Sequence, residues 1–107
     1  MLKQPIITEE KTMARTPIHP GEILQDELAE LNMAAAELAR AIDVPPNRIT
    51  QILAGKRSIS ADTALRLGKW FGTGPRLWLN LQQTYELDLA SQTLKGTLKK
   101  IKTRKAA

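Results

Sequence analysis

Two consecutive prolines, Pro45 and Pro46, constrain the fold of this 107-residue chain more than any other feature. Proline lacks a backbone N–H and restricts the residue before it, so a helix that approaches Pro45 has to end first. Proline is nevertheless favourable in the first turn of a helix, because the first N–H groups there have no intrahelical partner. We therefore predict that one helix ends at Asp43 and that another begins at Pro46.

The segments on either side of these prolines, 34–42 (AAAELARAI) and 46–55 (PNRITQILAG), have apolar residues at helical spacing. These residues are Leu38, Ala39 and Ile42 in the first segment, and Ile49, Ile52 and Leu53 in the second. Gly55 is suited to end the second helix, and Asp43 can tolerate a left-handed conformation if the turn places it in one. Two short helices joined by so short a turn have the layout of a helix-turn-helix.

Three further helices are predicted, at 19–32, 61–71 and 75–90. Pro20 and Pro75 suit first-turn positions, and Ser60 is a candidate N-cap for the middle helix. Because no strand-like alternation persists anywhere, we predict an all-α fold of five short helices. Residues 17–90 form the predicted domain, preceded by a flexible arm (1–16) and followed by a basic tail (91–107).

The net charge of +5 is concentrated in the tail, which has no acidic residue and carries six cations: Lys95, Lys99, Lys100, Lys102, Arg104 and Lys105. Residues 1–90 therefore carry a charge of −1, so overall basicity does not indicate that the domain binds DNA. We interpret the tail as a solvated, mobile end that adds non-specific attraction for phosphates. The spacing of Leu94, Leu98 and Ile101 also permits a short basic amphipathic helix.

The predicted helix at 46–55 turns polar side chains away from its apolar face. Arginine can donate two hydrogen bonds to guanine, Asn and Gln can pair with adenine, and the Thr methyl group can contact thymine. Asn47, Arg48, Thr50 and Gln51 are therefore candidate base-reading residues. The cations that cluster between residues 40 and 57 are candidates for phosphate contacts: Arg40, Lys56 and Arg57.

Other candidate sites are weaker. Trp78, Leu81 and Tyr85 form an apolar stripe that suits either core packing or a dimer interface. His19, the sole histidine, lies three residues before Glu22, but this pair lacks the further ligands or the nucleophile that a metal or catalytic site needs. The chain has no cysteine. We predict no enzymatic activity, no metal and no cofactor.

Residues 17–90 resemble the HigA family of type II antitoxins, which are phage-repressor-like helix-turn-helix proteins of the XRE type. The resemblance is carried by PIHPGEIL, AELARAIDVPPNRITQILAGKRSISADTALRLGKWFG and WLNLQQTYELDLA. It implies a five-helix, lambda-repressor-like domain and a cytoplasmic homodimer that binds operator DNA and represses its own promoter. It also implies a partner, a HigB-type toxin that cleaves mRNA on the ribosome, and it adds Pro46 to the base-reading positions.

The chain departs from the family pattern at the start of the first helix of the motif. Ala34 replaces the usual Ser or Thr cap, and Ala35 replaces a Gln that often contacts the DNA backbone. The loss of a cap costs about 0.5–2 kcal/mol of local stability. These departures leave open a protein-interaction module that has lost DNA binding. A second alternative is a phage-type or housekeeping repressor without a toxin. No segment has the length or apolarity of a signal peptide or a membrane span, so we expect no membrane partner.

Overall fold

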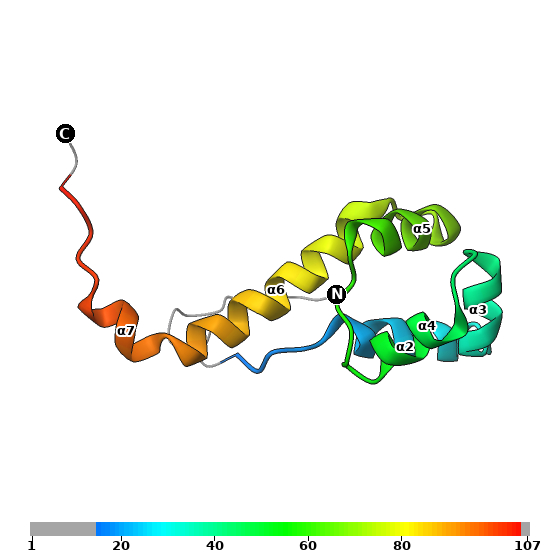
Figure 1. The fold of residues 1–107 in the computed structure, drawn as a ribbon, viewed down its shortest axis with the longest axis horizontal. Helices are drawn as coiled ribbons and strands as arrows, with labels where there is room; N and C mark the ends of the chain where they lie inside the picture. Colours follow the sequence, from blue (N-terminus) through cyan, green and yellow to red (C-terminus); the bar gives the residue numbers. More distant parts are fainter. Residues whose placement is uncertain (1–14, 106–107) are drawn as a thin grey trace.

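The computed structural model describes residues 15–105, which form six α-helices and contain no strand. The helices are α2 (Pro20–Glu30), α3 (Ala35–Ala41), α4 (Pro46–Leu53), α5 (Ala61–Phe71), α6 (Pro75–Thr93) and α7 (Lys95–Lys100). The all-α fold and its five expected helices are confirmed, and α7 lies in the basic tail. Helices α2 to α5 group at one end, and α6 extends away from them towards α7 (Figure 1). Most of the predicted flexible arm, residues 1–14, lies outside the described residues.

The helix starts follow the predicted proline positions. Pro20, Pro46 and Pro75 are each the first residue of a helix. Ser60 caps α5 as predicted, because its Oγ accepts a hydrogen bond from the Thr63 backbone N–H at 3.3 Å. Proline and the cap therefore account for the starts of four of the six described helices.

Helix α3 begins without a side-chain cap, because Ala34 occupies the N-cap position. The Glu37 Oε1 atom accepts a hydrogen bond from the Ala34 backbone N–H at 2.8 Å. This contact is the reciprocal half of a capping box, in which the residue at N3 binds the N-cap backbone. The predicted loss of the cap is thus real, and Glu37 still fixes the direction in which the chain enters α3.

The turn between α3 and α4 has the predicted left-handed residue. Asp43 has φ of 61°, and its backbone N–H donates to the Arg40 carbonyl at 3.2 Å. The next residue, Val44, is buried and donates its N–H to the Ala39 carbonyl at 3.0 Å. These two bonds satisfy carbonyls at the end of α3, and the buried Val44 anchors the turn on the core.

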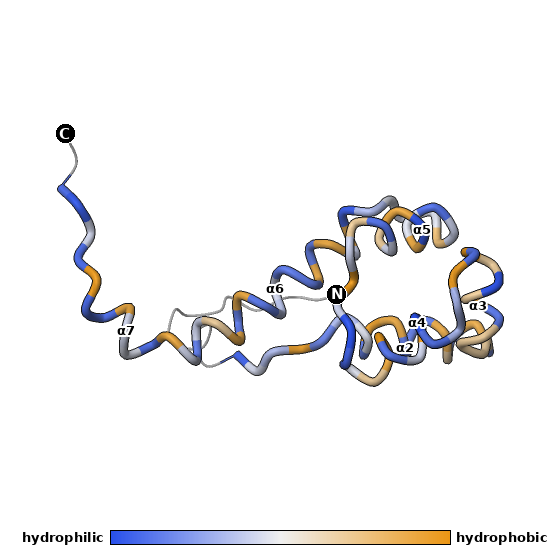
Figure 2. The backbone as a smooth tube through the Cα atoms, viewed as in Figure 1, coloured by the Kyte–Doolittle hydropathy of each residue, from blue (hydrophilic) through white to orange (hydrophobic). Residues whose placement is uncertain are grey.

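A single cluster of buried side chains draws on all the helices from α2 to α6. Figure 2 shows hydrophobic stretches alternating with hydrophilic ones along these helices, as amphipathic packing requires. Trp78 of α6 is 1% exposed and belongs to this cluster. The complete cluster is Leu24, Leu28, Leu38, Ala39, Ile42, Val44, Ile49, Ile52, Ile59, Ala64, Leu67 and Trp78.

The segment that follows α4 is attached to α6 by a buried polar contact. Gln82 is 5% exposed, and its Oε1 accepts a hydrogen bond from the Ile59 backbone N–H at 2.8 Å. The amide nitrogen of Gln82 donates to Glu86 Oε2 at 2.9 Å, so both ends of the side chain are satisfied. Burial of a polar side chain costs little when its groups are bonded, and the contact fixes how the chain leaves α4.

The N-terminal segment is attached to the same helix at a point beyond the core. Arg15 makes a bidentate contact with Asp88, with its Nε 3.1 Å from Oδ2 and its Nη2 3.0 Å from Oδ1. The Gln92 side chain also donates to the Arg15 carbonyl at 3.1 Å. The chain therefore runs along α6 before α2 begins.

The basic tail is exposed over all its described residues, as expected of a solvated end. It also contains helix, because α6 continues to Thr93 and α7 follows. Helix α7 agrees with the alternative interpretation, a short basic helix at this position. Leu94, Leu98 and Ile101 remain exposed, so α7 contributes no side chain to the core.

Helices α2 and α4 approach closely at Gly21. A Cβ atom added to Gly21 would overlap the Ile52 carbonyl oxygen, which belongs to the backbone and cannot rotate away. A glycine in a helix ordinarily costs about 0.5–1 kcal/mol relative to alanine. Glycine at residue 21 therefore lowers helix propensity, but it allows α2 and α4 to come into contact.

We predict that Gly21→Ala destabilises the protein by roughly 1–3 kcal/mol, because the overpacked contact has to move α2 away from α4. The matched control is Gly96→Ala in α7, where the added Cβ meets no atom of the described chain within 4 Å. This control is expected to be neutral or to stabilise by up to about 1 kcal/mol. Urea unfolding of both variants measures the difference, and equal effects would contradict the proposed close contact.

Candidate nucleic-acid interface

Helix α4 is held by one face and exposed on the other. Ile49 and Ile52 are fully buried, and the helix packs on α3 and on α2. Pro46, Asn47 and Thr50 on the outward face are exposed. This division is the one predicted from the apolar spacing, and it leaves a polar helix face available to a groove of DNA.

Asn47 and Thr50 differ in the groups that they leave available. The Thr50 Oγ1 donates to the Asn47 backbone carbonyl at 3.3 Å, so its hydroxyl hydrogen is used within the helix while its methyl group and oxygen lone pairs remain. The Asn47 side chain makes no hydrogen bond within residues 15–105. Its amide therefore offers both a donor and an acceptor, as bidentate recognition of adenine requires.

Gln51 lies at the edge of this face and is only half-exposed. Its Oε1 accepts a hydrogen bond from Arg57 Nε at 2.8 Å. One acceptor site of the amide is thus occupied, whereas the two N–H groups are not part of this contact. In this conformation Gln51 is better suited to donate to guanine or thymine oxygens than to bind adenine through both groups.

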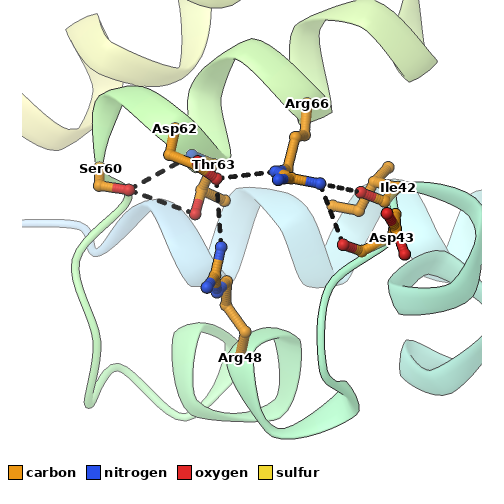
Figure 3. Close-up of polar contacts among 7 residues, drawn as sticks. All are labelled: Ile42, Asp43, Arg48, Ser60, Asp62, Thr63 and Arg66. Atoms are coloured by element: carbon orange, nitrogen blue, oxygen red, sulfur yellow. Dashed lines mark hydrogen bonds and ion pairs between the residues drawn. The ribbon is translucent and has the colours of Figure 1, made fainter.

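Arg48 does not extend freely from α4, in contrast with the sequence prediction. Its side chain is 29% exposed, and its Nη1 lies 3.2 Å from Asp62 Oδ1 near the start of α5. Figure 3 shows the guanidinium pointing across to that carboxylate. The guanidinium has further N–H groups, so this contact restrains Arg48 without consuming all of its donors.

Asp62 joins two arginines, an arrangement that was not predicted from the sequence. The Arg66 Nε donates to the same Oδ1 at 2.7 Å, and its Nη1 donates to the carbonyls of Ile42 and Asp43 at 2.8 and 3.0 Å (Figure 3). The hydrogen bond from Arg66 is the main cause that lowers the pKa of Asp62, and the positive charges of Arg66 and Arg48 act in the same direction. The carboxylate is therefore ionised at neutral pH.

The sequence contained one signal for part of this network. Asp62 and Arg66 are four residues apart in α5, which places them on the same helix face. Their contacts with α4 and with the α3–α4 turn join residues that are far apart in sequence, so helical spacing does not reveal them.

The three candidate phosphate contacts occupy the elements that flank α4 in the chain. Arg40 is exposed in the last turn of α3, and Lys56 and Arg57 are exposed just after α4 ends. The backbone N–H of Lys56 donates to the Gln51 carbonyl at 2.8 Å, which fixes the path of the chain at that point. Positive side chains on both sides of an exposed helix suit contacts with a DNA backbone.

The three dimer-interface candidates on α6 lie in different environments. Trp78 is in the core, and its Nε1 donates to Thr73 Oγ1 at 3.2 Å. Leu81 and Tyr85 are half-buried. A side chain as buried as Trp78 has little surface to offer a second copy, so any such role falls to Leu81 and Tyr85.

His19 has a structural role at the start of α2. It is the N-cap of α2, and its Nδ1 accepts a hydrogen bond from the Gly21 N–H at 2.8 Å. The imidazole also packs edge-on against Tyr85, with ring centroids 4.9 Å apart. Residues 15–105 hold no group of three or more His, Cys, Asp or Glu side chains that suits a metal ion, and none of their helices is long and apolar enough to cross a membrane.

The residues of this candidate interface, which lie between 40 and 57, fall within the part of the chain that matches known proteins. The Helix-turn-helix family matches residues 24–78, which contain α3, α4 and α5. Virulence-associated protein I of Dichelobacter nodosus is 49% identical over 76 residues, which cover 70% of this chain and 70% of that protein.

Two solved structures are similar over most of the chain. An addiction module antidote protein of the HigA family from Coxiella burnetii has 50% sequence identity and a TM-score of 0.81, over 85% of this chain and 100% of that one. The Pseudomonas aeruginosa antitoxin HigA, solved with the higBA promoter, has 43% identity and a TM-score of 0.77, over 81% of this chain and 97% of that one.

We predict that the protein loses stability as the pH falls below about 6.5, the ordinary pKa of histidine. Burial is the main cause that lowers the pKa of His19 in the folded chain, and it outweighs the Arg57 backbone hydrogen bond and the charge of Glu22. The unfolded chain therefore binds the proton more readily, so this stability is fully present above pH 6.5 and is lost below it.

Urea unfolding at pH 7 and pH 5 measures the change, with His19→Asn as the control. Asparagine is a good N-cap but does not titrate, so we expect a smaller loss of stability between the two pH values in this variant. The same loss in both proteins would show that His19 is not the responsible group.

Proposed function

Because the chain belongs to the helix-turn-helix family and, within it, to the HigA-type antitoxins, we propose that it represses its own promoter as a homodimer and neutralises a HigB-type toxin. HigA-type antitoxins are DNA-binding proteins and not enzymes. The proposal places the protein in the cytoplasm, where operator DNA and an mRNA-cleaving toxin are both present.

The observation that carries the DNA-binding half of the proposal is the division of α4 into two faces. Ile49 and Ile52 fix the helix on the core, whereas Asn47 and Thr50 are exposed beside cationic residues on both flanking segments. Specific recognition of DNA needs both features, since phosphate contacts set the register and base contacts select the sequence. The structural similarity to an antitoxin solved with a promoter supports the same assignment.

Within this proposal each candidate residue has a role. The residues that face the bases are Pro46, Asn47, Arg48, Thr50 and Gln51. Of the four polar side chains among them, Asn47 alone makes no hydrogen bond within residues 15–105. A second group binds phosphates and consists of Arg40, Lys56 and Arg57.

A homodimer is the geometry that this function requires. Two copies of α4 have to lie about 34 Å apart to enter successive turns of the major groove on one side of the duplex. Leu81 and Tyr85, half-buried on α6, are the candidate contacts between the copies. Burial of such apolar surface in a second copy is a favourable way to hold this spacing.

The similarity to antitoxins and antidote proteins supports the toxin half of the proposal. Co-expression of the protein with the product of a neighbouring small basic reading frame tests it. We expect the two proteins to form a stable complex, and we expect cellular mRNA to be protected from cleavage by the toxin. A specific operator complex without any such partner would favour the alternative, a repressor that acts without a toxin.

We predict that Asn47→Ala weakens binding to the protein's own promoter by about 1–3 kcal/mol and leaves binding to a scrambled duplex unchanged, because it removes a base contact. The matched control is Lys56→Ala, which removes a phosphate contact and should weaken both complexes equally. Fluorescence anisotropy at several salt concentrations measures the affinities of the wild type and of both variants for each duplex. If wild-type protein bound both duplexes equally with steep salt dependence, the protein would be a module that no longer reads DNA.

We also predict that removal of residues 94–107 makes DNA binding less dependent on salt, because the deleted segment carries six cations and no acid. For each cation that binds a phosphate, its removal reduces the slope of log affinity against log salt by about 0.9. The ratio of promoter to scrambled affinity should not change, since α7 lies at the opposite end of α6 from the group α2 to α5 (Figure 1). A large drop in that ratio would contradict this role of the tail.

A further inference from the structure

We propose that Asp62 is a specificity-determining positioning residue, which holds the Arg48 side chain so that its remaining N–H groups face a base edge. The inference rests on the proposed function, since it requires that α4 reads DNA. Asp62 itself lies at the start of α5 and does not have to contact DNA in this role. Its partner Arg48 is the residue that touches the base.

Arg48 is restrained before any DNA is present. An arginine side chain has many rotamers, and ordering it on binding costs conformational entropy. In the structure the Nη1 atom is already bound to Asp62 Oδ1 at 3.2 Å, and the side chain is largely covered. A guanidinium that is ordered before DNA arrives avoids part of this cost when it binds guanine.

Asp62 is itself held in place. The Arg66 Nε donates to Asp62 at 2.7 Å, and the Nη1 of the same arginine donates to the carbonyls of Ile42 and Asp43. These carbonyls belong to the turn that sets the start of α4. The contacts therefore form a continuous connection from the turn through Arg66 and Asp62 to Arg48 (Figure 3).

The Asp62 carboxylate has two effects of opposite sign on DNA binding. As a negative charge close to α4 it repels phosphates, and this repulsion is the same for every DNA sequence. As a support for Arg48 it favours only those sequences that place an acceptor edge opposite the guanidinium. The two effects are separable because a change in charge alters all affinities together, whereas a change in Arg48 position alters their ratio.

The test is Asp62→Asn, which keeps the shape of the side chain and removes its charge. We expect the ratio of promoter to scrambled affinity to fall roughly tenfold, which corresponds to about 1.4 kcal/mol of lost discrimination, while the affinity for the scrambled duplex stays the same or rises. If Asp62 acted only through charge, both affinities would rise by the same factor and the ratio would be unchanged. A variant that was merely less well folded would lose both affinities equally.

Two controls make the outcome specific. Asp26→Asn removes an acid that makes no ion pair with the described residues and should leave the ratio unchanged. In a background that carries Arg48→Ala, the Asp62→Asn change should also leave the ratio unchanged, because there is no side chain left to position. A ratio that still fell in that background would overturn the proposal.

The outcomes separate this inference from the proposed function. If wild-type protein prefers the promoter and Asp62→Asn leaves the ratio of promoter to scrambled affinity unchanged, the role of Asp62 is overturned. The proposal that the protein is a repressor then still stands. Wild-type protein that does not discriminate at all would overturn both.

Discussion

Burial of Ile49 and Ile52 is the interaction on which the rest of the structure depends. These two side chains fix α4 on α2 and α3, and the absence of a side chain at Gly21 allows α2 to approach the Ile52 carbonyl. Because α4 has fewer than three turns, it would not be stable alone, and tertiary packing supplies its stability. Because Ile49 and Ile52 point into the core, the polar residues on the opposite side of α4 point towards solvent.

The features that local chemistry controls could be predicted from the sequence. Pro46 and Pro75 marked helix starts because proline suits the first turn, and Asp43 fits the left-handed turn because aspartate tolerates that conformation better than most residues do. The predicted outward face of α4 follows from the spacing of Ile49 and Ile52. In each case the deciding interaction joins residues that are a few positions apart.

The features that the sequence did not reveal depend on contacts between distant residues. Gln82 binds the backbone at Ile59, and Asp62 binds Arg48, across separations that helical periodicity does not encode. In particular, Arg48 was predicted to project outward because its position on the helix allows it, whereas a carboxylate from another helix holds it. Periodicity assigns a residue to a face, but it does not identify the neighbour that this residue meets.

The physical setting of the Asp62 contacts favours a role in recognition over a role in stability. Ion pairs between exposed side chains contribute little to folding, because solvent screens the charges and both side chains lose rotamer freedom. The Asp62 side chain is 59% exposed although Arg48 is only 29% exposed, so solvent reaches the carboxylate and screens its pair with Arg48. The rotamer freedom that Arg48 gives up on folding, however, does not have to be given up again when the helix enters a DNA groove. An interaction that adds little to the free energy of unfolding can thus still increase the difference in affinity between one DNA sequence and another.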